Sequence, residues 1–248
     1  MAEVNILDTV PQRVLAIYAH PDDPYVASGG TLARWAREGA DVQAVVCTNG
    51  DKGTSAVGDP SSLSDESSRV DVGALGPKRV KEALRAGEVL GIGEQHFLGF
   101  SDGELDEATL RAEIVVWVRR VMPDVVVSHD PTAVFFGRDY FNHRDHRVVG
   151  WAALDAVSPA AALPLYFPKA GSPWQVRTVY LSGTMEPDAW VDISTTLAAK
   201  VEALSCHASQ FQDAGEWFRS AVHERAEEAG RQAGLVAAES FRTLRLIA

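Results

Sequence analysis

The sequence predicts an α/β protein built on a mostly parallel β-sheet flanked by helices. Short apolar runs alternate with longer amphipathic segments along most of the 248 residues, which is the pattern of repeated strand–helix–strand units. Runs such as 41–48 and 124–128 are almost entirely apolar, as expected of strands buried on both faces. No linker or internal repeat is evident. We therefore expect a single domain over 1–248, with a smaller C-terminal subregion over 158–248 as the alternative.

The individual elements follow from this pattern and from helix start and stop signals. Pro77 suits a first helical turn, Gly39 and Gly91 suit helix ends, and Ser194 suits an N-cap. Residues 54–76, rich in serine, glycine and aspartate, are expected to form a long loop. Strands are expected at 13–19, 41–48, 95–100, 124–128, 176–181, 190–193 and 236–246. Helices are expected at 29–38, 77–90, 106–121, 194–207 and 213–233, and one more follows 142–146 and runs to 157.

Composition narrows the class of protein. The formal net charge of −11 argues against a nucleic-acid surface, because phosphate binding requires clustered lysine and arginine. No apolar run reaches the roughly 18 residues of a membrane helix, and the acidic N-terminus lacks a signal-peptide layout. We expect a cytoplasmic protein without membrane or nucleic-acid partners. Cys47 and Cys206 are interpreted as small buried hydrophobic residues. The sequence leaves a homo-oligomer open.

The first chemical motif is AHPDD at 19–23, which follows the apolar strand at 13–19. An imidazole and two carboxylates therefore lie at the carboxyl end of a strand, where open α/β sheets bind ligands. His20 and Asp23 are suitable zinc ligands. Taken alone, the same turn could simply cap the following helix.

The second motif, HRDH at 143–146, also lies at a predicted strand-to-helix turn. His146 supplies a third metal ligand, and a catalytic zinc usually takes three from the protein. Asp22 is then available as a general base, and His143 as a group that stabilises the oxyanion or protonates the leaving amine. Asp145 is expected to hydrogen-bond to His143 and fix its tautomer. This set suits the hydrolysis of an amide.

The sequence resembles the zinc-dependent PIG-L/LmbE-like N-acetylglucosaminyl deacetylases. The matching segments are AHPDD at 19–23, GGT at 29–31, TNGDKG at 48–53, RxxE at 79–82, FLGFSD at 97–102, HRDH at 143–146, KxxALxxHxSQ at 200–210 and AESFR at 238–242. They recur in order over nearly the whole chain. The resemblance implies a Rossmann-like, LmbE-like fold and a small amino-sugar substrate.

The resemblance also assigns roles to residues. It makes His20, Asp23 and His146 the zinc ligands, Asp22 the general base, and His143 the acid or oxyanion group tuned by Asp145. Asp51, Arg79 and Asp102 fall where the family contacts substrate. Their alternative roles are structural, since Arg79 could pair with an acid on its own helix and Asp51 could shape its turn.

Two positions depart from the family pattern. Pro24 stands where the family usually has an acid directly after the two aspartates, and Arg144 stands where some members have proline. We expect the metal site to survive the change at Pro24, which alters the turn, and we expect Arg144 to add a positive charge near the site. The predicted activity is removal of an N-acetyl group from an N-acetylglucosamine-containing small molecule. The alternatives are an amidase for larger acyl groups and a metal- or sugar-binding protein without catalysis. A His-Asp-His site also accepts Fe²⁺ or another divalent ion in place of Zn²⁺.

Overall fold

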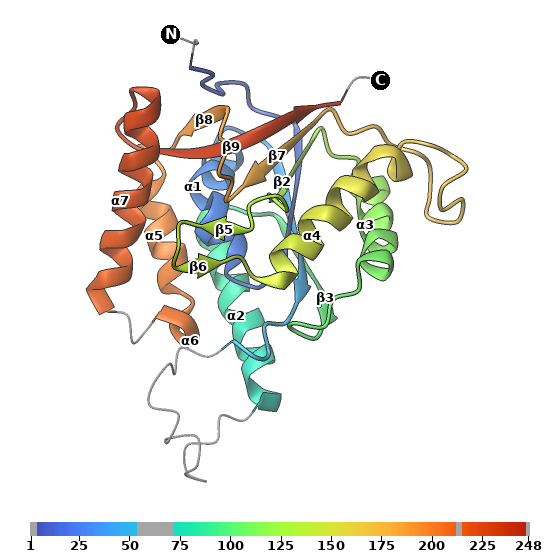
Figure 1. Ribbon diagram of the computed structural model, residues 1–248, viewed down its shortest axis with the longest axis horizontal. Helices are drawn as coiled ribbons and strands as arrows, with labels where there is room; N and C mark the ends of the chain where they lie inside the picture. Colours follow the sequence, from blue (N-terminus) through green and yellow to red (C-terminus); the bar gives the residue numbers. More distant parts are fainter. Residues whose placement is uncertain (1–3, 54–71, 212–214, 247–248) are drawn as a thin grey trace.

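A computed structural model of the protein describes residues 4–53, 72–211 and 215–246, and Figure 1 shows its arrangement. Seven strands form one sheet in the order β3-β2-β1-β4-β7-β9-β8. The first five in this order are mutually parallel, and β9 runs antiparallel to both β7 and β8. The strands are β1 Arg13–Tyr18, β2 Asp41–Thr48, β3 Glu94–Phe100, β4 Val125–His129, β7 Thr178–Ser182, β8 Ala189–Asp192 and β9 Ala238–Arg245. A separate two-stranded hairpin consists of β5 Phe135–Phe136 and β6 Tyr140–Phe141.

Helices cover both faces of the sheet, so the fold has three layers (Figure 1). One apolar core joins the sheet to α1 Asp23–Arg37, α2 Val72–Leu90, α5 Leu197–Ser205 and α7 Gly215–Ala233. The other joins it to α3 Glu107–Val121, α4 Arg144–Asp155 and the π-helical turn η3 Ala156–Ala161. The short α6 Ala208–Phe211 follows α5. The mostly parallel α/β fold is confirmed, and the C-terminal strands extend the same sheet.

The start of α1 is six residues earlier than expected. The helix begins at Asp23 instead of residue 29, and it kinks at Ser28, whose backbone is not helical. The kink has a side-chain cause, because the Tyr18 hydroxyl lies 2.9 Å from Ser28 Oγ, which also donates to the Pro24 carbonyl. The sequence pattern therefore predicts only the part of α1 that follows Ser28.

A buried cluster holds α1 at this kink. The Glu239 carboxylate of β9 accepts hydrogen bonds from the backbone N–H groups of Gly30 (3.0 Å) and Thr31 (2.8 Å). Lys200 of α5 pairs with the same carboxylate at 2.6 Å. Ile193 lies so close that a Cβ on Gly30 would come within 2.8 Å of it. Three of the segments that carry the family resemblance, 29–31, 200–210 and 238–242, thus meet here and have a structural role.

Two other boundaries also differ from the prediction. α2 begins at Val72, so Pro77 lies inside the helix and not in its first turn. The first turns of this helix pack against the end of β2, since a Cβ on Gly76 would lie 3.2 Å from the Asn49 side chain. The rest of the expected 54–76 loop, residues 54–71, lies outside the described residues. Ser194 does not cap α5, because its hydroxyl donates to Asp192 and the N-cap position is Thr196.

The topology determines where a site can form. The chain runs from β1 through β2 to β3 on one side, and then returns to place β4 on the other side of β1. The carboxyl ends of β1 and β4 therefore flank the point at which the strand order reverses, which is where open α/β sheets bind ligands.

Within the described residues, no helix is both long and apolar enough to span a membrane.

Candidate active site

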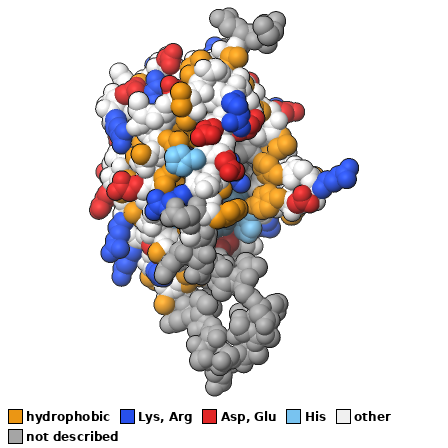
Figure 2. Space-filling model, turned by 90° about the vertical axis from the view of Figure 1, so that its left-hand side faces the viewer, with side chains coloured by type: hydrophobic (Ala, Val, Ile, Leu, Met, Phe, Trp, Pro, Cys, Tyr) orange, Lys and Arg blue, Asp and Glu red, His pale blue; other side chains and the backbone are white. Residues whose placement is uncertain are grey.

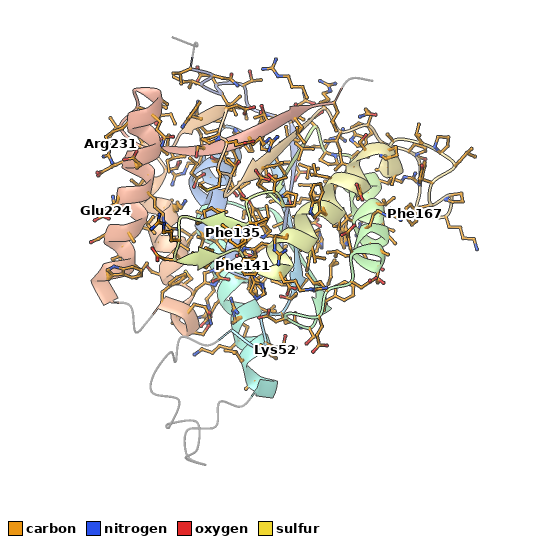
Figure 3. The ribbon with its side chains drawn as sticks, in the orientation of Figure 1. Lys52, Phe135, Phe141, Phe167, Glu224 and Arg231 are labelled. Atoms are coloured by element: carbon orange, nitrogen blue, oxygen red, sulfur yellow. The ribbon has the colours of Figure 1, made fainter. Side chains whose placement is uncertain are left out.

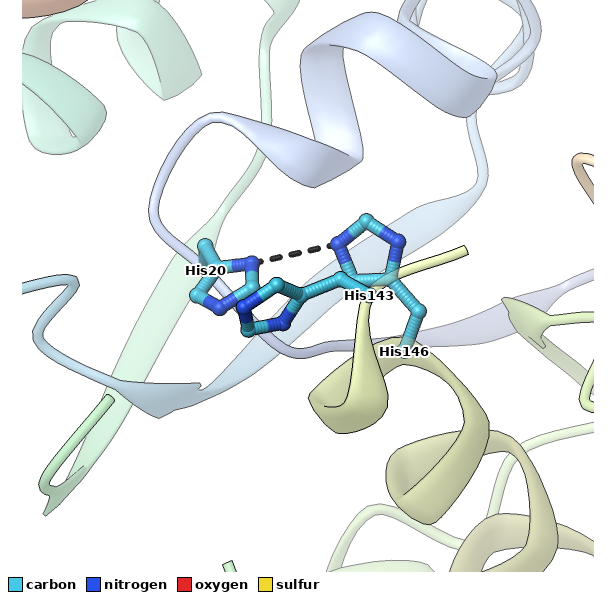
Figure 4. Close-up of side chains that lie close together, drawn as sticks. All are labelled: His20, His143 and His146. Atoms are coloured by element: carbon cyan, nitrogen blue, oxygen red, sulfur yellow. Dashed lines mark hydrogen bonds between the residues drawn. The ribbon is translucent and has the colours of Figure 1, made fainter. Parts of the chain in front are cut away.

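Three side chains from two distant parts of the chain meet at this edge of the sheet. His20 follows β1, Asp23 opens α1, and His146 lies in the first turn of α4. His20 Nδ1 lies 3.1 Å from His146 Nε2 and 3.2 Å from Asp23 Oδ2. His146 Nε2 lies 3.3 Å from Asp23 Oδ1. The structure thus brings together the three residues predicted to be metal ligands, and Figure 4 shows the two imidazoles with His143 beside them.

Hydrogen bonds on the far side of each ring orient these imidazoles. His20 Nε2 lies 3.2 Å from Asp102 Oδ1, an oxygen that can only accept while the carboxylate is ionised. His146 Nδ1 lies 3.1 Å from Asn142 Oδ1. When each far nitrogen carries the proton, His20 Nδ1 and His146 Nε2 present lone pairs to one another and to Asp23. Oxygen partners that orient ligating histidines in this way are typical of metal sites.

The geometry of this cluster fits a bound cation. Two lone pairs and a carboxylate oxygen at 3.1–3.3 Å repel one another unless a proton or a metal ion lies between them. In a tetrahedral zinc site with bonds of about 2.0–2.1 Å, ligand atoms lie about 3.3 Å apart. His20, Asp23 and His146 are therefore suited to hold a metal ion. Related groupings that could hold a metal include His143, Asp102 and Asp145 around His20, and His129 with Asp23 and His146.

His129, at the end of β4, has a larger part in the cluster than its sequence indicates. Its Nε2 accepts the backbone N–H of Ala19 at 3.2 Å and lies 3.3 Å from Asp23 Oδ2. Its ring stacks on His146 with centroids 4.1 Å apart. The pairing of β4 with β1 places His129 there. Asn142 was missed altogether; its spacing of four residues before His146 was the available signal.

Burial and charge perturb these groups strongly. Burial raises the pKa of the Asp23 carboxyl, but the adjacent His146 and His20 outweigh it and lower that pKa well below its ordinary value. Burial lowers the pKa of His20, but the Asp23 and Asp102 carboxylates outweigh it and raise that pKa well above its ordinary value. Burial lowers the pKa of His129 to about 4, so this ring is neutral near pH 7. The pKa values in this cluster are thus shifted strongly, as is typical of functional sites.

Asp22 is held beside the cluster by an ion pair. The buried Arg79 of α2 donates to Asp22 Oδ1 at 2.7 Å and to the Gly50 carbonyl at 2.9 Å. Arg79 thus pairs with Asp22 and not with an acid on its own helix. Gly50 and Gly53 pack against its guanidinium, since a Cβ on Gly50 would lie within 2.6 Å of Arg79 Cζ. The TNGDKG segment is therefore needed, at least in part, to cover Arg79.

Asp51 and Asp102 order the neighbouring loop. Asp51 Oδ1 accepts the backbone N–H of Asp102 at 2.9 Å. Lys52 donates to the Asp102 carbonyl at 2.7 Å. Asp102 in turn contacts His20, so its side chain orients a predicted ligand. Contact of Asp51, Arg79 and Asp102 with a substrate remains a prediction.

The predicted bond between the Asp145 carboxylate and His143 is not the one that forms. Asp145 is buried in the first turn of α4, and its Oδ2 accepts the backbone N–H of Gly103 at 2.6 Å. It is the backbone N–H of Asp145 that donates to His143 Nδ1, at 3.3 Å, because His143 is the N-cap of α4. This bond leaves the proton of a neutral His143 on Nε2. Burial and the adjacent His20 lower the pKa of His143, so Nε2–H is available as a neutral donor.

Comparison with known proteins identifies the family of this chain. Residues 15–157 match the family model described as PIG-L, GlcNAc-PI de-N-acetylase. The chain belongs to the PIG-L family. A diacetylchitobiose deacetylase of Thermococcus kodakarensis is 32% identical, over 93% of this chain and 82% of that protein. A 1D-myo-inositol 2-acetamido-2-deoxy-alpha-D-glucopyranoside deacetylase of Streptomyces avermitilis is 31% identical, over 85% of this chain and 87% of that protein.

The fold comparison agrees with the PIG-L assignment. An N,N'-diacetylchitobiose deacetylase from Pyrococcus horikoshii, solved with an inhibitor, superposes with a TM-score of 0.82 at 27% identity. The match covers 95% of this chain and 84% of that one. Sequence relatives and a structural neighbour of this PIG-L protein are therefore named as deacetylases, which are hydrolases of N-acetyl amides.

The PIG-L metal motif tolerates its unusual proline. Pro24 lies at the second position of α1, where a missing N–H breaks no intrahelical hydrogen bond. The side chain of Arg144 lies 3.5 Å from Asp145 and is half exposed. Neither departure displaces the predicted ligands.

A cavity of about 470 Å³ opens next to the cluster. Two predicted metal ligands, Asp23 and His146, line one end of it. Asp22 and His143 are not among its lining residues. The remaining lining residues come from α1, β4, the β5–β6 hairpin, β7 and α7: Val26, Ala27, His129, Asp130, Phe136, Tyr140, Asn142, Ser182, Gly183 and Arg225. The cavity therefore extends from one side of the metal cluster toward α7.

Proposed function

We propose that this protein is a zinc-dependent hydrolase that removes an N-acetyl group from a small molecule containing N-acetylglucosamine. The observation that supports it most is the convergence of His20, Asp23 and His146 with two acid–base candidates, Asp22 and His143, at one edge of the sheet. Relatives named as deacetylases of amino-sugar compounds support the substrate class.

The roles follow from position and charge. His20, Asp23 and His146 would hold a Zn²⁺ ion, which would act as a Lewis acid and lower the pKa of a water molecule to about 7. Asp22, fixed by Arg79, takes the proton from the attacking water. His143 donates through Nε2–H to the oxygen that becomes negative during attack, and then assists departure of the amine. Asp145 acts on His143 through its backbone N–H and on the adjacent loop through its carboxylate.

The other candidates have less support. A protein without catalysis would have no need to keep Asp22 and His143 beside the cluster. Fe²⁺ or another divalent ion would use the same ligands, and metal analysis distinguishes it from Zn²⁺. A cytoplasmic location, and the absence of nucleic-acid or membrane partners, stay predictions.

Metal content and acetate release test the proposal together. We expect near-stoichiometric zinc in the purified protein, acetate release from N-acetylglucosamine compounds, and loss of both in His146→Ala. His223→Ala serves as the control, because His223 lies on the exposed side of α7. Metal-free protein that binds no divalent ion after reconstitution would contradict the ligand set. Metal-loaded protein that releases no acetate would contradict the reaction.

A further inference from the structure

We propose that a second cavity, at the edge of the sheet opposite the metal cluster, binds a small organic monocarboxylate with an apolar body. This cavity has a volume of about 440 Å³. It lies at the amino ends of β4 and β7 and at the carboxyl end of the antiparallel β9, and Val125, Thr178 and Arg245 line it there. His20 and Asp23 instead follow the carboxyl end of β1, which is parallel to β4. The two sites are therefore separated by the length of the strands.

Figures 1 and 3, drawn in one orientation, show this separation. Lys52, labelled in Figure 3, marks the metal-cluster edge, because it donates to the carbonyl of Asp102, whose side chain contacts His20. The carboxyl end of β9 lies at the far side of the same view (Figure 1). A ligand in the second cavity would thus not touch the groups proposed to act on the amide.

One side of the cavity is formed by the segment before β1, residues 7–12. This segment is held at both ends, because the Leu7 N–H donates to the Trp190 carbonyl at 2.8 Å and the Gln12 carbonyl accepts the Asp41 N–H at 2.8 Å. Three residues between these anchors also line the cavity: Thr9, Val10 and Pro11. The space is therefore enclosed between ordered parts of the fold.

Strand alternation explains which side chains form the opposite side. Tyr180 of β7 is the register partner of Thr243 on β9, and Arg245 lies two residues further along β9. Side chains two residues apart on a strand share a face, and these three line the cavity. Val179 and Leu244, which alternate with them, pack in the apolar core on the other face of the sheet. The sheet thus directs a phenol and a guanidinium into one cavity.

Tyr180 supplies a buried hydrogen-bond donor. The residue is 8% exposed, and its ring packs against Trp35 and Phe241 with centroids 5.6 and 5.8 Å away. Its hydroxyl has no hydrogen-bond partner among the residues that the structure describes. Burial raises the pKa of Tyr180 and the charge of Arg245 opposes this rise, so the guanidinium lies near the hydroxyl. Two such donors side by side suit an oxyanion.

The charges around the cavity favour a monoanion. Two arginines, Arg177 and Arg245, and one acid, Asp124, line it, so its net charge is +1. Arg245 forms no ion pair within the described part of the chain. Arg177 Nε lies 3.9 Å from Asp124 Oδ1, a long separation for an ion pair, and Asp124 Oδ2 accepts the Arg13 N–H at 3.1 Å. Arginine binds carboxylates through paired N–H groups.

A basic cavity is not a general property of this protein. The chain has a formal net charge of −11. On the face over α7, Figure 2 shows basic side chains interspersed with acidic ones. The excess of arginine over acid is thus a local feature of the second cavity.

Apolar side chains provide a surface for the body of the ligand. Four lining residues are aliphatic or proline: Leu7, Val10, Pro11 and Val125. The volume of about 440 Å³ lies within the range of roughly 300–1,000 Å³ found for small-molecule sites. Acetate, the product of the proposed reaction, would leave most of this space unfilled. A carboxylate on a ring would contact both the arginines and the apolar residues.

Four probes separate the contribution of charge from that of the apolar body: phenylacetate, phenylacetamide, acetate and phenyl phosphate. Calorimetry on the metal-loaded protein measures each Kd, and the same titration after metal removal excludes binding to the metal. We expect phenylacetate to bind with a Kd of about 1 mM or tighter in both forms. Phenylacetamide lacks the charge and acetate lacks the ring, so each should bind at least tenfold more weakly. Phenyl phosphate should bind no tighter than phenylacetate.

Variants locate the bound probe. Arg245→Gln removes a charged donor and should weaken phenylacetate binding roughly tenfold. Tyr180→Phe keeps the ring but removes the hydroxyl, and should weaken it roughly two- to tenfold. Arg242→Gln is the matched control on β9, because Arg242 does not line this cavity and is paired with Glu186 at 3.1 Å; it should leave the Kd unchanged. Phenylacetate should also slow amide hydrogen exchange in residues 7–12.

Each contrary outcome overturns a stated part of the inference. Equal binding of phenylacetate and phenylacetamide would overturn the carboxylate assignment, and tenfold tighter binding of phenyl phosphate would overturn the choice of a monoanion. Binding that disappears with the metal, or that Arg242→Gln weakens as much as Arg245→Gln, would place the probe outside this cavity. No binding of phenylacetate would overturn the site. None of these measurements uses acetate release, so the deacetylase proposal stands or falls separately.

Discussion

Two ion pairs hold the first part of α1, and they differ in how far their carboxylates are buried. Arg79–Asp22 lies just before the helix, and Lys200–Glu239 lies at its kink. Both oxygens of Glu239 are occupied, one by Lys200 and Gly30 and the other by Thr31. In the Arg79–Asp22 pair, Oδ1 is the one Asp22 side-chain oxygen with a hydrogen-bond partner among the described residues. The Asp22 side chain stays 17% exposed beside His20 and Asp23.

The difference indicates how each pair is used. A buried carboxylate with a partner on each oxygen can stabilise a fold but is not accessible to a substrate. A carboxylate that is fixed on one oxygen and accessible on the other is oriented for proton transfer. We therefore expect changes at the Asp22 end to reduce turnover, and changes at the Glu239 end to reduce stability.

Asp22→Asn should give the largest effect. The amide keeps an oxygen for Arg79 but cannot take a proton, so we expect turnover to fall roughly 10²- to 10⁴-fold, the usual contribution of general base catalysis. Zinc content should remain at the wild-type level, because Asp22 is not among the predicted ligands. Steady-state kinetics with metal analysis on the same sample measures both. Normal turnover would show that Asp22 is not the general base. The two ion pairs would then not differ in function as argued above.

Lys200→Met tests the other end. Methionine keeps much of the length of the side chain but leaves Glu239 as a buried charge without its counterion, which typically costs about 3–5 kcal/mol. Denaturant unfolding should show this loss, while the zinc affinity of the folded protein stays unchanged. The double variant Lys200→Met/Glu239→Gln removes the uncompensated charge and should recover part of the loss. A single variant as stable as the wild type would show that the pair is not needed for the fold.

Asn142→Ala addresses the metal cluster through a residue that is not a predicted ligand. It removes the acceptor that fixes the His146 tautomer, and loss of such a partner usually weakens metal binding by about 10- to 100-fold. Competition with a chelator measures the affinity. Asn142→Asp keeps an acceptor at the same place and should retain tight binding. Equal affinities in both variants would mean that the His146 ring is oriented by its stack on His129 instead.

The sequence could predict that His20, Asp23 and His146 lie close together because topology constrains their positions. His20 and His146 are 126 residues apart. His20 lies at the carboxyl end of β1, where ligands bind in open α/β sheets, and His146 reaches the same edge from the start of α4, after the β5–β6 hairpin that follows β4. The strand order did not have to be known for this argument.

Side-chain direction is what the sequence could not provide. Asp145 lies two residues from His143, yet its carboxylate turns to Gly103 because it is buried in the first turn of α4. The contact of Glu239 with Gly30 spans 209 residues and depends on the antiparallel insertion of β9 beside β8. The kink at Ser28 comes from a hydroxyl on β1. Each of these features is determined by tertiary packing and not by local pattern.

The smallest expected effect comes from two adjacent glycines of α1. A Cβ on Gly30 would lie 2.8 Å from three atoms of Ile193, whereas a Cβ on Gly29 would lie 3.4 Å from Lys200 Cγ, an ordinary contact. Gly30→Ala should therefore lose about 1–2 kcal/mol of unfolding free energy, since overpacking outweighs the gain from a better helix former. Gly29→Ala should be neutral or gain up to about 1 kcal/mol. Thermal unfolding of the two variants side by side measures the difference. If Gly30→Ala also weakened zinc binding, the kink of α1 and the turn that carries His20 and Asp23 would be mechanically coupled. The Glu239 end of α1 would then contribute to function as well as to stability.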